Sequence, residues 1–553
     1  MSDKTAKKHK KLSLKECVSA VIPAVACSFL LFMYAPFEMY FTNKSEFWFD
    51  FYNMIGVELV LFAVGAVVLS GVLILCRLIH ENLYRVVYGI STVLFVSTFV
   101  EGSILSRNVP ILDGRKVDWN DFNGHRILSA LIIILLAAAV IVTIKFIKFE
   151  KFESITRASY LIIIVALFGS LIVLGSKNNG FQAKKRLIVN KEHEFEYSTD
   201  QNIIVFIIDA VDADAFEEVL AEHPEYNEEL SDFTYYSNMV STYIQTVNSV
   251  PYLLTGVWYR GELVEDLETY ETREVERSAL LKRLQRHGYR IGYYEVDCHP
   301  LECKRMLTFD NVLKADNWKI DPLSYAKNMV KLVGYRYAPL DLKRFCYVYY
   351  RDFLYNEEAS ANENLYYDYN DEFYRDIQTV PFETMEDKFF KVYHIEGAHQ
   401  PFVFDKDVNR IENGTYSQNI EASFTIVTEY LNKLKECGVY DNSAIIVMSD
   451  HGFNEMDNPM GRLHPIFFAK GFGEQKDTLS FDDAPVSFED FQEAVAKLEQ
   501  GNTGDDIFSW KEGDERDRKC YVRFYNNPVT AYNIQCIQHG HAGEIDNVEI
   551  VGK

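Results

Sequence analysis

Residues 202–208 read Asn-Ile-Ile-Val-Phe-Ile-Ile and are followed by Asp209. The run is apolar without alternation, which predicts a β-strand buried on both faces, as the central strands of parallel sheets are. The next stretch, Asp212–Leu220, carries its apolar residues at helical spacing. A buried strand that leads into an amphipathic helix is typical of an α/β domain with a mostly parallel sheet flanked by helices.

The same alternation continues to the end of the chain. Further β-rich runs predict strands at Tyr289–Val296, Phe389–Tyr393 and Ala444–Met448. Amphipathic runs predict helices at Ser278–Arg286, Ile420–Cys437 and Phe488–Leu498. We therefore expect one α/β domain over residues 201–553.

The first third of the chain has a different character. Five apolar stretches of about 17–22 residues, the length that crosses a bilayer, lie at Val18–Tyr34, Ile55–Cys76, Val86–Leu105, Ile127–Ile144 and Ala158–Leu174. They predict a bundle of five transmembrane helices over residues 1–175. The polar residues 176–200 are then the linker to the α/β domain.

Charge is divided in the same way. The 553 residues carry a net charge of −24, yet residues 1–180 hold 18 basic and 13 acidic side chains, whereas the remainder holds 38 basic and 67 acidic ones. Because phosphate binding needs a basic face, the strongly acidic second part makes nucleic acid an unsuitable partner.

Basic residues beside the spans predict the orientation. They precede the first span and crowd the second and fourth connections, notably at Lys7, Lys8, Lys10, Lys11, Lys15, Arg77, Arg85, Lys145, Lys148, Lys151 and Arg157. By the positive-inside rule the N-terminus is cytoplasmic, and five crossings place the α/β domain outside the cytoplasm, on the plasma or inner membrane. Glu101, at the outer end of the third span, is better explained as a water-facing acid than as a functional carboxylate. Cys298 and Cys303 could pair in an oxidising compartment.

Proteins built on a parallel sheet bind their ligands beyond the carboxyl ends of the strands. Several predicted strands end in polar residues that can bind a metal: Asp209, His394 with nearby His399, and Asp450 with His451 and then His464. Adjacent carboxylate and imidazole groups supply oxygen and nitrogen ligands to a divalent ion. The pattern predicts a metal site at this edge of the sheet.

Such a metal would activate a hydroxyl group for attack on phosphorus. The segment Thr246-Val-Asn-Ser-Val-Pro-Tyr-Leu-Leu-Thr-Gly256 predicts a helix that a hydroxyl opens and a glycine closes. By chemistry alone Thr246, Ser249 and Thr255 are all candidate nucleophiles, and a plain helix-capping threonine is the alternative.

Three motifs carry a resemblance to a known family: IIVFIIDA around Asp209, TVNSVPYLLTG from Thr246, and IIVMSDHGF around Asp450 and His451. Together they resemble the sulfatase-like branch of the alkaline phosphatase superfamily. In sulfatases the modified nucleophile stands seven positions before the first Leu of a similar LLTG, and counting back from Leu253 reaches Thr246. The TxxSVP motif of the lipid phosphoethanolamine transferases places a nucleophilic threonine at the same point.

The chain departs from true sulfatases, because Asn248 and Val250 stand where their CxPxR signature has Pro and Arg. Five spans before an outer catalytic domain resemble the membrane-anchored phosphoethanolamine transferases and the phosphoglycerol-transferring lipoteichoic acid synthases. Their first metal ligand is usually Glu, whereas here it is Asp209.

The resemblance implies a metal-dependent phosphotransferase with Thr246 as nucleophile. Asp209, Thr246, Asp450 and His451 would hold a divalent metal, Zn or Mn, and His394, His399 and His464 would bind substrate, the last two with a catalytic role. Phosphoglycerol or phosphoethanolamine would pass from a membrane phospholipid to a glycan or lipid acceptor through a phospho-threonine intermediate. The alternatives are a sulfatase-like phosphodiesterase or hydrolase and a catalytically silent lipid-binding regulator.

Overall fold

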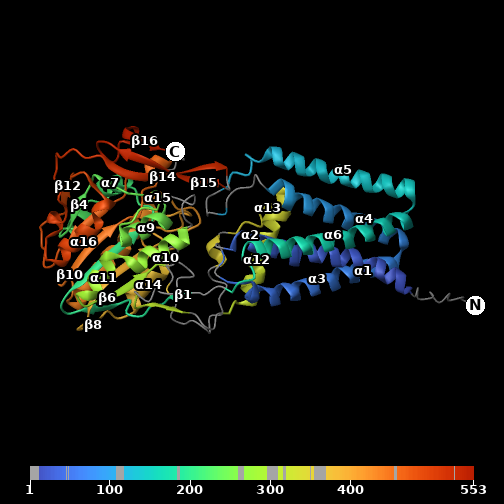
Figure 1. The fold of residues 1–553 in the computed structure, drawn as a ribbon, viewed down its shortest axis with the longest axis horizontal. Coiled ribbons are helices and arrows are strands. Elements are labelled where there is room, and N and C mark those ends of the chain that lie inside the picture. Colours follow the sequence, from blue (N-terminus) through green and yellow to red (C-terminus); the bar gives the residue numbers. More distant parts are fainter. Residues whose placement is uncertain are drawn as a thin grey trace, which may run out of the picture. The chain divides into compact units, whose positions relative to one another are not determined.

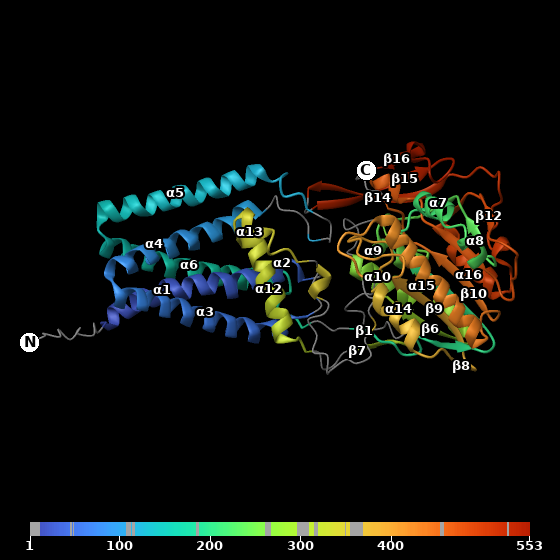
Figure 2. The ribbon, with the colours of Figure 1, turned by 180° about the vertical axis from the view of Figure 1, so that it is seen from behind.

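The chain forms two compact units. Residues 1–184 and 317–361 make unit 1, and residues 185–316 and 362–553 make unit 2; Figures 1 and 2 show their helices and strands from two sides. The computed structural model describes residues 12–44, 47, 49–106, 112, 117–183, 187–259, 267–295, 309–314, 319–348, 350–353, 366, 369–453, 458–527 and 530–552. Cys298 and Cys303 lie outside the described residues.

Unit 1 is a bundle of long apolar helices. Among the described residues five are long and apolar enough to cross a membrane, which agrees with the five predicted spans: Leu14–Thr42, Phe51–Ile79 (α3), Glu81–Ser103, Asn123–Ile147 (α5) and Phe149–Lys177 (α6). The first joins α1 (Leu14–Phe29) to α2 (Ala35–Thr42) through a π-helical turn, and the third is α4 (Glu81–Val100) followed by another such turn. Many of their apolar side chains are exposed, as lipid-facing residues must be.

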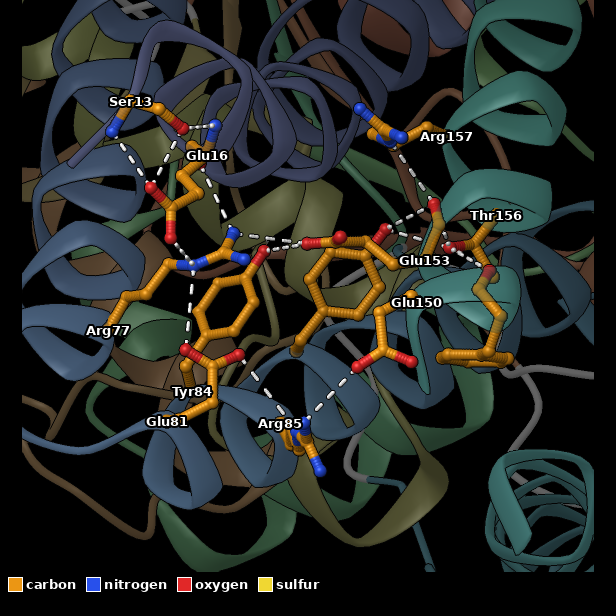
Figure 3. Close-up of polar contacts among 12 residues, drawn as sticks. Ser13, Glu16, Arg77, Glu81, Tyr84, Arg85, Glu150, Glu153, Thr156 and Arg157 are labelled. Carbon is orange, nitrogen blue, oxygen red and sulfur yellow. Dashed lines mark hydrogen bonds and ion pairs between the residues drawn. The ribbon is translucent and has the colours of Figure 1, made fainter. Parts of the chain in front are cut away.

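A polar network joins one end of this bundle (Figure 3). The Arg77 guanidinium, at the end of α3, lies 3.2 Å from the carboxylate of Glu153 on α6 and 3.8 Å from those of Glu16 and Glu81. The Tyr84 hydroxyl donates to Glu153 at 2.6 Å. Both Arg77 and Glu153 are buried. Because buried charges are tolerated only when they are paired, this network ties four of the spans together.

Residues 317–361 belong to the helical unit although they lie within the predicted outer domain. They form α12 (Pro322–Tyr337) and α13 (Leu340–Lys343). Tyr325 of α12 donates to Glu58 of α3 at 2.7 Å, and Arg336 donates to Glu38 of α2 at 2.8 Å. The segment thus supplies polar partners to carboxylates of the spans.

Glu101 is a further carboxylate of the spans that is paired by this segment, and its position corrects the interpretation of Glu101 as a water-facing acid. The side chain is buried rather than water-facing. It hydrogen-bonds to His125 at 3.1 Å and to Ser129, and it lies 4.0 Å from the buried ammonium group of Lys343 on α13. Burial of this carboxylate is offset by three polar partners.

Unit 2 is built on a seven-stranded sheet with the order β12-β4-β11-β10-β3-β9-β6. The strands are β3 (Asn202–Ile208), β4 (Thr234–Tyr236), β6 (Tyr289–Tyr294), β9 (Lys388–Ile395), β10 (Ser443–Met448), β11 (Phe467–Lys470) and β12 (Ser480–Asp482). The neighbours β10, β3, β9 and β6 run parallel, and β11 is antiparallel to both its neighbours. Every residue of β3 and β10 is buried, so the predicted mostly parallel α/β fold is confirmed.

Helices flank this sheet, and smaller sheets complete the unit. The helices are α7 (Ala213–Glu222), α8 (Tyr226–Glu229), α9 (Thr246–Thr255), α10 (Leu267–Arg277), α11 (Ala279–Arg286), α14 (Asn370–Thr379), α15 (Tyr416–Cys437) and α16 (Phe491–Glu499). Near the C-terminus β14 (Arg518–Asn527), β15 (Thr530–Gln538) and β16 (Val548–Gly552) form an antiparallel sheet. The remaining strands pair as β1 (Leu187–Val189) with β7 (Val312–Lys314), β2 (Glu196–Ser198) with β8 (Glu383–Met385), and β5 (Met239–Val240) with β13 (Val486–Ser487).

Replacing Arg77 by Met should destabilise the bundle, because the Glu153 carboxylate would stay buried without its cation. The expected loss is about 3–5 kcal/mol of unfolding free energy, measured as a lower melting temperature of the detergent-solubilised protein. Arg85→Met is the matched control, since the Arg85 side chain is 39% exposed and its pairs are of the weak surface kind. Equal melting temperatures for the two variants would contradict the role given to Arg77.

Candidate active site

The parallel strands β10, β3 and β9 bring a group of acids and imidazoles together at their carboxyl ends. Asp209 directly follows β3, His394 is the penultimate residue of β9, and Asp450 stands two residues beyond β10. All three are buried, and one ligand atom of each lies within 4.8 Å of the others. Nε2 of His451 is 3.4 Å from the Asp450 carboxylate and 3.8 Å from that of Asp209.

Backbone contacts hold the carboxylates in place. One oxygen of Asp450 accepts the N–H groups of Ala210 at 3.1 Å and His451 at 3.0 Å. Ala210 has a φ of 58°, so the chain turns sharply straight after Asp209. Gly397 has a φ of 60°, and a Cβ there would lie 2.5 Å from the Asp209 backbone nitrogen. Only glycine lets the loop after β9 pack this closely against Asp209.

The electrostatics suit ligands of a cation. Burial lowers the pKa of His451 to about 4, so its imidazole is neutral at pH 7. Its Nδ1 lies 2.8 Å from the Gly452 carbonyl oxygen, which can only accept a hydrogen bond, so Nδ1 carries the proton and Nε2 keeps the lone pair. Burial acts to raise the pKa of Asp450, but His451, His394 and the Thr246 hydroxyl outweigh it and hold that pKa below its usual value. Asp450 is therefore a carboxylate.

Thr246 is the hydroxyl that reaches this group. It opens α9, and its hydroxyl lies close enough to the Asp450 carboxylate to lower the pKa of that group. The other two candidates bond elsewhere: Ser249 donates to the Asp450 backbone oxygen at 2.6 Å, and Thr255 donates to the Pro251 carbonyl at 2.7 Å. Geometry thus separates three hydroxyls that chemistry alone left equivalent.

The remaining histidines lie differently. His399 is partly buried, with Nδ1 2.6 Å from the Gln400 carbonyl oxygen. His464 is buried, with Nε2 2.7 Å from the Ser237 carbonyl oxygen and Nδ1 3.2 Å from the Asp214 carboxylate. Burial lowers the pKa of His464, but the hydrogen bond with Asp214 outweighs it, so the pKa is raised overall.

His394, predicted to bind substrate, lies instead within the cluster of candidate metal ligands, and its partner was not predicted. Nδ1 contacts the carboxylate of Glu295, and both side chains are fully buried. Burial acts to lower the pKa of His394, but Glu295 raises it to about 10. Glu295 directly follows β6, which ends at Tyr294. The strand predicted at Tyr289–Val296 included Glu295, so the strand-end rule did not single it out.

A divalent metal fits these side chains. Two carboxylates and two imidazoles form a mixed oxygen and nitrogen donor set, of the kind that Zn and similar transition metals prefer to an all-oxygen one. The second oxygen of Asp450 and Nε2 of His394 are buried without a hydrogen-bond partner. Asp209, His394, Asp450 and His451 would hold the ion, with the Thr246 hydroxyl beside it.

Comparison with known proteins gives a family match for part of the chain. Residues 201–464 match the family model described as Sulfatase, which confirms the resemblance inferred from the motifs. A search of curated proteins found no match. The family assignment therefore rests on residues 201–464, the stretch that carries all the candidate site residues.

Solved structures similar to the chain include three enzymes or domains, all of low identity. Ps i-CgsB is 15% identical, with a TM-score of 0.39 and coverage of 62% of this chain and 83% of that one. The lipoteichoic acid synthase LtaP from Listeria monocytogenes is 10% identical, with a TM-score of 0.35 and coverage of 61% and 85%. The C-terminal periplasmic domain of EcEptC from Escherichia coli is 10% identical, with a TM-score of 0.33 and coverage of 60% and 92%.

Asp450→Asn should weaken metal binding, because it removes one of the anionic ligands. We expect chelation to lower the melting temperature of the wild type and to leave that of Asp450→Asn nearly unchanged, since a ligand stabilises only a protein that binds it. Metal content by mass spectrometry provides the second readout. The exposed Asp483→Asn is the control and should behave as the wild type does. Full metal retention by Asp450→Asn would exclude this site.

Proposed function

We propose that this sulfatase-family domain, residues 201–464, transfers a phospholipid headgroup, phosphoglycerol or phosphoethanolamine, to a glycan or lipid acceptor through a phospho-threonine on Thr246. The observation that carries the proposal is the Thr246 hydroxyl, which stands at the start of a helix and near enough to the Asp450 carboxylate of the buried acid–imidazole cluster to lower its pKa. Five apolar helices in the same chain support a substrate that lies in a membrane.

A bound Zn or Mn ion would lower the pKa of the nucleophilic hydroxyl and neutralise charge on the phosphoryl oxygens. The protein supplies the rest. The Asp450 carboxylate, whose pKa the nearby Thr246 hydroxyl lowers, would accept a hydrogen bond from that hydroxyl and orient its Oγ1. The ten-residue α9 begins at Thr246, and the N-terminus of a helix favours an anion bound beside it.

The first step forms a bond between Thr246 Oγ1 and phosphorus and breaks the bond from phosphorus to the diacylglycerol oxygen. The Thr246 proton leaves through a protein base, and the departing oxygen takes up a proton to become diacylglycerol. In the second step an acceptor hydroxyl attacks phosphorus and Thr246 is released. His399 and His464 would contact the phosphate or exchange these protons, and the raised pKa of His464 suits a proton donor.

The membrane spans have a physical purpose in this proposal. The donor is confined to the bilayer, so anchoring the domain raises its effective concentration at the lipid surface. We place the N-terminus in the cytoplasm and the catalytic domain outside, in accordance with the basic residues that flank the spans.

Thr246→Val should abolish the covalent intermediate, because the isostere lacks the attacking oxygen. Wild-type protein in vesicles of phosphatidylglycerol and phosphatidylethanolamine should carry a headgroup phosphate on the Thr246 peptide, detected by mass spectrometry, and should release diacylglycerol. We expect product formation to fall by at least about 10³-fold in Thr246→Val. Thr246→Ser retains a hydroxyl and should retain part of the activity.

The matched control is Thr255→Val, in the same helix but with its hydroxyl on the Pro251 carbonyl. It should form the adduct as the wild type does. Free headgroup released without an acceptor would identify a hydrolase, and lipid binding without metal or adduct would identify a regulator. Turnover that survives Thr246→Val would refute the proposed nucleophile.

The orientation predicts opposite labelling of two exposed positions. In a variant without native cysteines, Glu512→Cys in the catalytic domain should react with a membrane-impermeant maleimide on intact cells. Lys151→Cys, at the cytoplasmic start of α6, should react only after the cells are permeabilised. The reverse pattern would invert the topology and move the chemistry to the cytoplasmic side.

A further inference from the structure

Glu295 is a buried acid in the candidate site that the proposed reaction does not use. It follows β6 directly, and β6 runs parallel to β9 with Tyr294 opposite Tyr393. One residue further along, Glu295 and His394 meet, and the Glu295 carboxylate contacts Nδ1 of His394. Neither side chain has any exposed surface. Sheet register, rather than a flexible loop, brings the two residues together.

The other nitrogen of His394 lies on the opposite edge of the ring. Nε2 is buried and has no hydrogen-bond partner. One ring nitrogen of His394, one carboxylate oxygen of Asp209 and one carboxylate oxygen of Asp450 all lie within 4.8 Å of one another. Since Nδ1 is engaged by Glu295, Nε2 is the atom that remains for the cluster.

Burying a carboxylate is costly unless another group compensates it. Here His394 compensates the buried Glu295 carboxylate, and this contact also determines which ring nitrogen of His394 carries the proton. The Glu295 carboxylate in contact with Nδ1 can only accept, so it favours the tautomer with the proton on Nδ1 and leaves the lone pair of neutral His394 on Nε2. An imidazole held in this way cannot rotate, and the carboxylate behind it strengthens the ring as an electron-pair donor.

We propose that Glu295 is a positioning residue that fixes the ring orientation and tautomer of His394, so that His394 Nε2 acts as a ligand of the divalent cation beside Asp209 and Asp450. The assignment rests on the proposed function, because it assumes that the cluster holds a metal. It extends that function by moving His394 from the substrate to the metal and by adding a residue that touches neither.

The test is a metal titration of the full-length protein in detergent. The protein is stripped with a chelator and titrated with Zn²⁺ by calorimetry, and the melting temperature of the metal-free form is recorded. Glu295→Leu keeps the approximate volume and removes the acceptor, so its affinity should fall about 10–100-fold. Glu295→Gln keeps an oxygen that can accept from Nδ1 but loses the charge, and should lie between Glu295→Leu and the wild type.

Two further variants give the reference points. His394→Gln should lose at least as much affinity as Glu295→Leu. Glu194→Gln removes another buried carboxylate of unit 2, one whose charge neighbours are Lys191, Asp376 and Lys391, and should bind zinc as the wild type does. A purely structural role of Glu295 would lower the melting temperature of the metal-free protein without this graded loss of affinity.

The outcomes separate the two proposals. Wild-type zinc affinity in Glu295→Gln overturns the inference, whether or not Glu295→Leu folds. If Asp450→Asn also binds zinc normally, the metal site itself is wrong and the proposed function fails with it. A loss in Asp450→Asn with none in Glu295→Gln leaves the proposed function standing and removes Glu295 from it.

Discussion

The parallel pairing of β10, β3 and β9 is the constraint on which the candidate site depends. Parallel strands end at the same edge of a sheet, so Asp450, Asp209 and His394 meet there although 241 positions separate the first and last of the three along the chain. Each strand is buried on both faces, which leaves its end residues little freedom to relax away from one another. The sheet therefore imposes the convergence of charge.

That convergence creates a need for positive charge. Asp209, Asp450 and Glu295 are buried carboxyl groups within reach of His394 and His451. Without a cation, the acids raise the pKa of His394 to about 10, that is, they attract a proton to the ring. A divalent ion would satisfy the same demand and would take the place of that proton, since a proton and a metal compete for one lone pair. The negative charge of the buried acids therefore accounts both for the raised pKa of His394 and for the affinity expected for a divalent cation.

Much of this arrangement could be predicted from sequence because its parts are local. An apolar run followed by an acid predicts a strand end, and the distance from Thr246 to Gly256 predicts a short helix that begins at a hydroxyl. Long-range facts could not be predicted in this way. The sequence does not state that β6 lies beside β9, so Glu295 had no visible partner. The residue pattern of α9 also did not show which of Thr246, Ser249 and Thr255 faces Asp450, because that depends on how the helix is rotated against the sheet, and only the family motifs singled out Thr246.

The grouping of residues 317–361 with the membrane bundle could not be predicted either, because it also depends on long-range contacts. The local sequence of α12 and α13 does not show where the two helices pack, and their placement follows from contacts with residues more than 200 positions earlier. Glu38, Glu58 and Glu101 of the spans meet Arg336, Tyr325 and Lys343, respectively. Carboxylates at the ends of membrane helices are costly when left unpaired. The bundle therefore cannot complete its polar pairing until residues 317–361 have been synthesised. The residues on either side of this segment belong to unit 2. Because the chain passes from unit 2 into this segment and back, the folding of the two units is coupled through the chain connectivity.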